Sequence, residues 1–155
     1  MSEECRTIHN IIRLPYNWSL GPTWTKFFDF LKNDQIYGTR CKRCNKTFVP
    51  ARSFCPECYF DIEEWIEVSQ EGTLQSWAIV NRSYPGQVKT PPYVVASIHL
   101  DGADSNFCHF IDGTDLKDIN VIKKKLTKGM RVRAVWREEK KGDINDISYF
   151  EPVIR

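Results

Sequence analysis

The chain has 155 residues, a formal net charge of +2, and 41% hydrophobic and 27% charged residues, which is a soluble globular composition. This length excludes a TIM barrel or a Rossmann domain with a second substrate domain. A pI near 8.2 is below the value of about 9 that marks dedicated nucleic-acid-binding domains. No apolar run approaches the roughly 18 residues of a membrane span, and the first residues lack the layout of a secretory signal. We therefore expect a cytoplasmic protein with no membrane association.

The first predicted element is a short helix that begins at Pro22, because proline suits the first turn of a helix. Large apolar residues then repeat at helical spacing and form one face, namely Trp24, Phe27, Phe28 and Leu31. A single helix of about 12 residues with such a face is not stable alone in water. The face must pack inside this chain or form a partner interface, and the sequence leaves both interpretations open.

Four of the six cysteines stand in two C-x2-C pairs, Cys41 with Cys44 and Cys55 with Cys58. In a cytoplasmic protein such pairs are metal ligands more often than disulfides. Together they complete a closed tetrahedral shell of four thiolates, which leaves no open position for substrate or water. Asn45 follows the first pair, where the backbone favours a residue that tolerates the left-handed region. The pattern predicts a zinc ribbon with one structural Zn2+ per chain, and an iron centre for electron transfer is the less favoured alternative.

From residue 62 onward the apolar pattern changes from helical to β periodicity. It predicts a long strand from Trp65 to Val80 with a bend or bulge at Gly72. The later predicted elements are strands over 93–100 and 107–111, a helix over 115–126, and strands over 130–137 and 144–153. Three strands, a helix and two further strands are the order of a five-stranded Greek-key barrel of the OB type.

The predicted fold class is therefore mainly β, with an N-terminal helical arm, a zinc ribbon and a five-stranded OB-fold barrel. We expect the arm and the aromatic helix to span residues 1–37, the ribbon 38–61 and the OB-fold domain 62–155.

The segment 81–92 joins the first two barrel strands and is longer than an ordinary hairpin connection, and loops of this size often carry function. Arg82 and Lys89 supply positive charge for a phosphate or carboxylate, while Tyr84 and Tyr93 supply rings for stacking or apolar contact. Prolines at both ends limit the freedom of the loop and lower the entropy lost on binding. A ligand-binding loop and a surface loop without a role both remain open.

No motif joins a nucleophile to a base. Cys108 and His109 are neighbours on a predicted strand, so their side chains should point to opposite faces. We expect Cys108 to be a small buried core residue, His99 to be a barrel histidine with its hydrogen bonds satisfied, and Cys5 to be a free thiol near the terminus. The sequence therefore predicts no autonomous active site.

Several stretches resemble the zinc-ribbon/OB-fold acyl-CoA-associated proteins. They are Gly-Thr-Arg-Cys-Lys-Arg-Cys at 38–44 and Pro-Ala-Arg-Ser-Phe-Cys-Pro-Glu-Cys at 50–58, together with the aromatic helix and the predicted barrel. The resemblance extends from about Pro22 to Pro152, and segment 91–102 is most similar to the thiolase-associated branch.

The resemblance implies that the ribbon is rubredoxin-like and that the chain is a non-catalytic small subunit of a thiolase, an acyltransferase that cleaves a β-ketoacyl-CoA with coenzyme A. It further implies a thiolase-like large subunit in a hetero-oligomer, of which a heterotetramer is one arrangement, with the catalytic residues on that partner. The acyl-CoA would lie at or near the interface, beside the loop that carries Arg82, Tyr84, Lys89 and Tyr93.

A zinc ribbon with an OB fold also describes several nucleic-acid-binding proteins, which combine a basic groove with exposed stacking aromatics. Residues 121–141 hold nine Lys or Arg and would fit that class. The five acids within 61–72, and the concentration of aromatics in the N-terminal helix and early strands, oppose it. Nucleic-acid binding is therefore the less favoured alternative.

Overall fold

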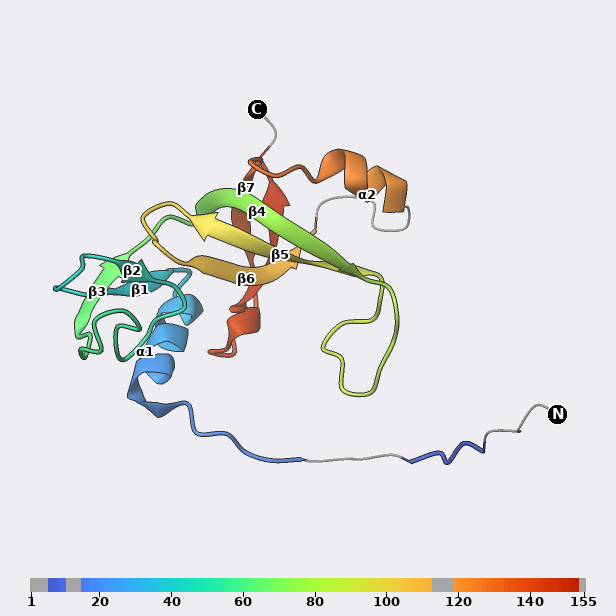
Figure 1. Cartoon of the computed structure of the whole chain (residues 1–155), viewed down its shortest axis with the longest axis horizontal. Helices are drawn as coiled ribbons and strands as arrows, with labels where there is room; N and C mark the ends of the chain where they lie inside the picture. Colours follow the sequence, from blue (N-terminus) through green and yellow to red (C-terminus); the bar gives the residue numbers. More distant parts are fainter. Residues whose placement is uncertain (1–5, 11–14, 113–118, 154–155) are drawn as a thin grey trace.

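The computed structural model describes residues 6–10, 15–112 and 119–153, which form a small ribbon sheet beside a closed barrel (Figure 1). The elements are α1 (Gly21–Lys32), β1 (Tyr37–Arg40), β2 (Thr47–Phe48), β3 (Glu64–Glu67), β4 (Glu71–Val80), β5 (Tyr93–Leu100), β6 (Asn106–Ile111), α2 (Ile119–Lys125), β7 (Arg131–Trp136), η1 (Ile144–Asp146) and β8 (Ile147–Pro152). The ribbon sheet has the order β2-β1-β3 and the barrel has the order β4-β5-β6-β8-β7. This architecture confirms the predicted fold class.

The barrel closes through a parallel pairing of β6 with β8, at Ile111 opposite Phe150, whereas its other pairings are antiparallel. Every barrel strand contributes fully buried apolar side chains to the interior, among them Leu74, Ile98, Phe107, Val132 and Phe150. Helix α2 follows β6, as in the predicted order, and the start of that predicted helix lies outside the described residues. Neither α1 nor α2 is long and apolar enough to cross a membrane, as judged over the described residues.

The single long strand predicted from Trp65 to Val80 is wrong. It is two strands: β3 belongs to the ribbon sheet, where Trp65 lies opposite Thr39, and β4 begins the barrel at Glu71. Between them, the Val68 N–H donates to the carbonyl of Ile36 at 2.9 Å as the chain leaves one sheet for the other. Both strands share the same period-two pattern, so periodicity could not mark the break.

Of the bend or bulge predicted at Gly72, the bulge lies elsewhere. The register shift of β4 against β5 lies between Leu74 and Ser76 instead. Gly72 is required for a different reason, because a Cβ at this position would lie 2.5 Å from the carbonyl oxygen of His99 and 2.9 Å from the Cα of Leu100. The close approach of β4 and β5 backbones therefore excludes any side chain here.

The aromatic face of α1 is filled by this chain itself. Phe27 and Leu31 are fully buried, Phe28 is 6% exposed, and all three belong to the same core cluster as the barrel interior. Trp24 is partly buried and packs edge-on to Phe28, and the centre of its ring lies 5.8 Å from that of Trp18 in the arm. The face predicted as a partner interface thus offers a partner little beyond part of Trp24, because the ribbon and the end of the barrel cover the rest (Figure 1).

The ribbon is fastened to the barrel by the β5–β6 connection. The Thr47 N–H donates to Asp104 Oδ2 and the Asp104 N–H donates to the Thr47 carbonyl, each at 2.8 Å. One residue later, Ser105 Oγ accepts from the Val49 N–H at 2.8 Å and donates to the Val49 carbonyl at 2.9 Å. Four hydrogen bonds in this short segment give the ribbon a fixed orientation on the barrel.

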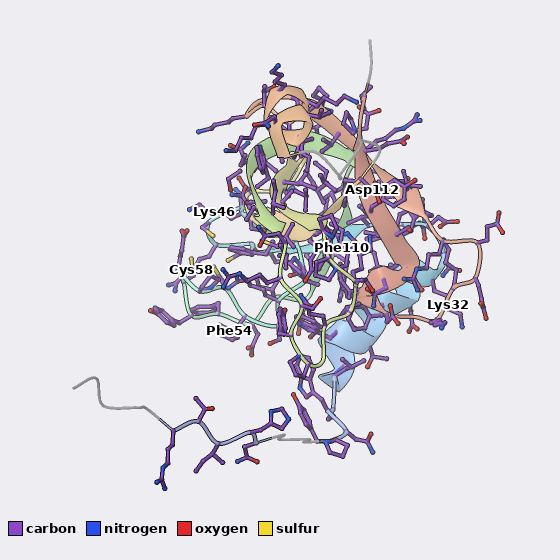
Figure 2. The ribbon with its side chains drawn as sticks, turned by 90° about the vertical axis from the view of Figure 1, so that its right-hand side faces the viewer. Lys32, Lys46, Phe54, Cys58, Phe110 and Asp112 are labelled. Atoms are coloured by element: carbon purple, nitrogen blue, oxygen red, sulfur yellow. The ribbon has the colours of Figure 1, made fainter. Side chains whose placement is uncertain are left out.

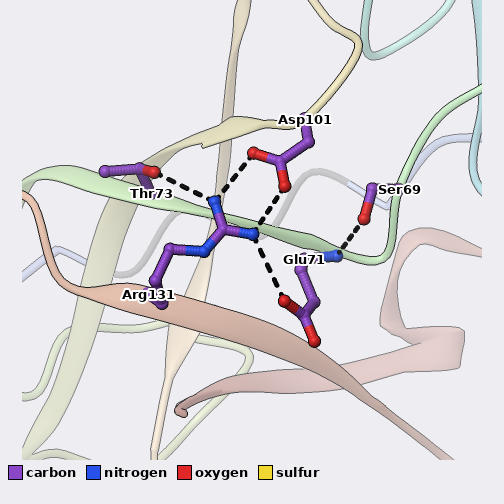
Figure 3. Close-up of polar contacts among 5 residues, drawn as sticks. All are labelled: Ser69, Glu71, Thr73, Asp101 and Arg131. Carbon is purple, nitrogen blue, oxygen red and sulfur yellow. Dashed lines mark hydrogen bonds and ion pairs between the residues drawn. The ribbon is translucent and has the colours of Figure 1, made fainter. Parts of the chain in front are cut away.

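A cluster of hydrogen bonds and ion pairs surrounds Arg131 of β7, within the barrel (Figure 3). Its guanidinium donates to both carboxylate oxygens of Asp101, at 2.8 and 2.5 Å, and also to Glu71 and Thr73 of β4. Its hydrogen bonds hold the pKa of Asp101 below the ordinary value. The cluster therefore ties β4 and β7 to the turn that follows β5, near the start of the barrel.

Candidate metal centre and binding loop

The two cysteine pairs sit in backbone turns of the same construction. The carbonyl of Cys41 accepts from the Asn45 N–H at 2.8 Å, and the carbonyl of Cys55 accepts from the Tyr59 N–H at 2.9 Å. In both turns the residue after the second cysteine has a positive φ, 59° at Asn45 and 56° at Tyr59. This repeated turn points the paired sulfurs inward, and Figure 2 places Cys58 on the ribbon side of the molecule.

The four sulfur atoms of Cys41, Cys44, Cys55 and Cys58 lie within 4.8 Å of one another. A tetrahedral ion with metal–sulfur bonds of about 2.3 Å requires sulfurs about 3.8 Å apart. The separation of the Cys44 and Cys55 sulfurs is 3.7 Å, which matches that requirement. The residues therefore fit a closed tetrathiolate metal site.

The electrostatics of the cluster favour a bound cation. The backbone N–H of Cys44 lowers the pKa of the Cys41 thiol to about 7, whereas burial and then the neighbouring sulfurs raise the pKa of Cys58 to about 12. Four thiols this close cannot all ionise without a compensating charge, and a divalent ion supplies it. Cys41 and Cys55 are buried, whereas Cys44 and Cys58 are partly exposed.

The predicted binding loop, residues 81–92, extends from the ends of β4 and β5 that lie farthest from the ribbon (Figure 1). Gln87 organises its interior: its side-chain oxygen accepts from the Tyr84 N–H at 2.9 Å, and its amide donates to the Arg82 carbonyl at 3.0 Å. The Lys89 ammonium lies 4.6 Å from the centre of the Phe110 ring on β6. The part of the loop at Lys89 therefore contacts the barrel wall, whereas residues 81–86 are exposed.

The four residues predicted for this loop differ in accessibility. Arg82 and Tyr84 are exposed, Lys89 is half-buried, and Tyr93 is buried at the start of β5. Hydrogen bonding to Tyr93 raises the pKa of Tyr84, so the two phenols are neighbours. Beside the loop is a hollow of about 230 Å3, which is mostly apolar and is lined by Val88, Val95, Cys108, His109, Phe110, Ile144 and Asn145.

Cys108 and His109 point to opposite faces of β6, as predicted, but the expectation that Cys108 is buried is wrong. Cys108 is exposed, and His109 is the buried member of the pair. His109 donates from Nε2 to the Ile144 carbonyl at 3.1 Å, and burial lowers its pKa. His99 is half-exposed and pairs through Nδ1 with Asn106 at 3.3 Å. Cys5 lies outside the described residues.

Three exposed aromatics at the outer end of the ribbon were not singled out from the sequence: Phe54, Tyr59 and Phe60, with 51%, 82% and 55% of their surface exposed. A signal for one of them was present. The residue after the first cysteine pair, Asn45, was expected to adopt the left-handed backbone region. The same expectation applies to the residue after the second pair, which is Tyr59.

Both structural units match known family models. Residues 28–61 match the rubredoxin-like zinc ribbon domain of ChsH2, and residues 65–137 match the ChsH2 C-terminal OB-fold domain. A DUF35 domain-containing scaffold protein of Methanocaldococcus jannaschii is 31% identical over 123 residues, which are 76% of this chain and 82% of that protein. The chain belongs to the DUF35 family.

Two solved structures share the fold of this DUF35 chain at 22% sequence identity. One is a DUF35 protein of unknown function from Sulfolobus solfataricus, with a TM-score of 0.60 over 85% of this chain and 84% of that one. The other belongs to the Ltp2–ChsH2(DUF35) aldolase, with a TM-score of 0.63 over 92% of this chain and 100% of that one. At this identity the likeness concerns the fold alone.

Proposed function

We propose that this DUF35 chain is the non-catalytic, zinc-binding scaffold subunit of a thiolase that cleaves a β-ketoacyl-CoA with free coenzyme A. The observation that carries the proposal is the placement of the cysteine and histidine side chains, which the structure does not bring together as a nucleophile and a base. Four cysteines form a closed cluster with no open coordination position, and Cys108 and His109 lie on opposite faces of β6. Thiolysis needs a cysteine nucleophile, a base and oxyanion donors in one site, so a large subunit must supply them.

We propose Zn2+ as the ion held by Cys41, Cys44, Cys55 and Cys58, one per chain. Its role is structural: it neutralises the thiolates and fixes the two turns, and the binding energy contributes directly to folding. Metal analysis of purified protein tests this assignment. One zinc per chain supports it, whereas one iron with visible thiolate-to-iron absorption would establish the electron-transfer alternative.

We propose that the 81–92 loop lies beside the acyl-CoA in the complex. Its support is threefold: Arg82 and Tyr84 are exposed, Val88 of the loop lines a mostly apolar hollow, and Gln87 holds the loop in one shape before binding. A preordered loop over the substrate would exclude water and orient the thioester. Within the thiolases, we favour benzoylsuccinyl-CoA thiolase of anaerobic toluene degradation as the specific enzyme, because segment 91–102 resembles the thiolase-associated branch.

The test begins with co-purification from the native source and identification of the large subunit by mass spectrometry. A thiolase-like partner is expected. The reconstituted complex is then compared with one in which residues 84–90 of this chain are replaced by a short Gly-Ser linker. We expect the linker variant to assemble normally but to lose at least tenfold in kcat/KM. Equal activity would remove the loop from the proposal, and tight binding of single-stranded DNA near 200 mM salt, with no enzyme partner, would favour the nucleic-acid class.

A further inference from the structure

Tyr59 occupies a backbone position that suits a tyrosine poorly. Its φ of 56° lies in the left-handed region, where a Cβ crowds the backbone and where glycine or asparagine is the low-cost residue. The equivalent position of the first turn is filled by Asn45 with nearly the same φ. The turn itself therefore requires the left-handed conformation in both places, and Tyr59 adopts it at a conformational cost.

Among the residues that the structure describes, no contact of the Tyr59 side chain offsets that cost. The side chain of Tyr59 is 82% exposed, and within the described residues its phenol forms no hydrogen bond and its ring contacts no other ring. Its backbone N–H bonds to the Cys55 carbonyl, but asparagine or glycine would make the same bond. Strain at a residue with no internal contacts points to a contact made outside the chain.

Tyr59 stands among other side chains suited to an interface. Phe54 and Phe60 are more than half exposed, and the Arg43 guanidinium lies 4.3 Å from the centre of the Phe60 ring. We call Arg43, Phe54, Tyr59 and Phe60 the ribbon tip. Arginine and aromatic side chains are the residues most enriched at protein interfaces and among their energetic hot spots. In Figure 2 the labelled Phe54 and Cys58 lie on the same side of the molecule, away from Lys32 of α1.

The surface beside the ribbon tip is hollowed and mixed in charge. A hollow of about 380 Å3 next to Phe60 is lined by Arg40, Cys41, Lys42, Arg43, Phe60, Asp61, Ile62 and Glu63. Within the described residues, neither Arg43 nor Lys42 forms an ion pair, whereas Lys46 is paired with Glu57. The Arg43 guanidinium is therefore available for a bidentate pair with a carboxylate, and the Phe60 ring beneath it holds it in place.

The acids in this hollow indicate which kind of partner fits. Asp61 and Glu63 line the same hollow as the basic residues and would repel the continuous negative charge of a nucleic-acid backbone. A protein surface that presents a single carboxylate between apolar side chains matches the Arg43 guanidinium and the exposed rings of Phe54 and Tyr59.

We propose that the ribbon tip is a docking surface for the partner enzyme subunit, on a face of that subunit where a carboxylate is flanked by apolar side chains. The inference rests on the proposed function in that the partner is an enzyme subunit. It goes beyond that function because the ribbon tip lies at the opposite end of the molecule from the 81–92 loop (Figure 1).

The test uses the full-length zinc-loaded chain and the large subunit that co-purifies with it. Tyr59→Asn should raise the melting temperature of the free chain, because the strain is relieved, and should weaken association with the large subunit at least tenfold in Kd. A structural role for Tyr59 cannot produce these two opposite changes together. Asn45→Gly is the matched control, since it alters the same backbone position of the other turn without removing a ring, and its Kd should equal that of wild type.

A second variant, Arg43→Met, should also raise the Kd at least tenfold. The difference in Kd between variant and wild type should be smaller at high salt, because salt screens the charge pair and weakens wild-type binding. Wild-type Kd values for both Tyr59→Asn and Arg43→Met would overturn the inference and leave the proposed function intact. Failure of any enzyme subunit to bind wild-type protein would overturn both. Binding of a 15-nucleotide oligo(dT) that Tyr59→Asn abolishes would also overturn it, because the ribbon tip would then be a nucleic-acid surface.

Discussion

The packing of α1 against the rest of the chain can be tested with one buried ring and one exposed ring. Phe27 is fully buried in the core cluster shared by α1 and the barrel, whereas Phe54 on the ribbon is 51% exposed. Phe27→Ala and Phe54→Ala remove the same atoms, so the difference between the two variants measures the burial of the α1 face and not the chemistry of the substitution.

The expected magnitudes are far apart. Truncation of a fully buried phenylalanine to alanine costs about 3–5 kcal/mol, because apolar contacts are lost and a cavity remains. The same change at an exposed position is typically within about 0.5 kcal/mol. For a chain of this length each kcal/mol lowers the melting temperature by about 2–4 °C, so Phe27→Ala should melt roughly 6–20 °C below wild type.

The assay is urea unfolding of both variants with zinc in excess, followed by far-ultraviolet circular dichroism and tryptophan fluorescence. We expect Phe27→Ala to lower the transition midpoint strongly with little change in slope, and Phe54→Ala to leave it near wild type. If the two variants differ by less than about 1 kcal/mol, the α1 face is not part of the core of the free chain. The interpretation as a partner interface would then be correct.

Three further predictions concern the metal site, a buried histidine and a glycine. Cys58→Ser should lower the zinc content below one per chain and lower the melting temperature, and an unchanged metal content and melting curve would contradict the site. Burial lowers the pKa of His109, so the unfolded chain binds the proton more readily, and folding stability should fall as pH drops below about 6.5. His109→Gln should lack this part of the pH dependence. Urea titrations of both proteins at pH 7.5 and 5.5 would measure the difference. Gly72→Ala should destabilise by more than about 2 kcal/mol, because its Cβ would meet the His99 carbonyl oxygen at 2.5 Å, and a wild-type melting curve would show that β4 and β5 can separate at this point.

The ribbon and the helix were predictable because their signals are local. A C-x2-C pair must turn tightly to bring two sulfurs to one ion, so Cys41, Cys44, Cys55 and Cys58 predict their own geometry. The face of α1 follows from helical spacing in the same way. Whether that face packs inside the chain or against a partner could not be read from spacing, because it depends on how the ribbon and the barrel come together.

The errors arose where distant parts of the chain decide the outcome. Strand alternation shows that Cys108 and His109 face opposite ways, but it does not show which side of β6 faces the barrel interior. The more polar residue is inside because the Ile144 carbonyl accepts its hydrogen bond and because its ring stacks on Phe107 and meets Phe150 edge-on. Ile144 is 35 residues away in sequence and Phe150 is farther, so the local alternation pattern carries no record of these two neighbours.

The strand break between β3 and β4 has a similar cause. The apolar pattern continues across it, and the division is made by pairing: β1 takes β3, while β5 and β7 take β4. The hydrogen bonds of Asp104 and Ser105 with the ribbon also join segments more than 50 residues apart. Such pairings depend on the assembled fold and have no local signature.

The thiolysis rate of the large subunit, measured before and after this chain is added, tests the central claim most directly. With a β-ketoacyl-CoA and free coenzyme A as substrates, we expect the large subunit alone to be at least tenfold slower than the reconstituted complex. We also expect Cys108→Ser to restore activity as well as wild type does, because the proposed function assigns the nucleophile to the large subunit. Full activity from the large subunit alone, or loss of activity with Cys108→Ser in an intact complex, would contradict a non-catalytic scaffold role.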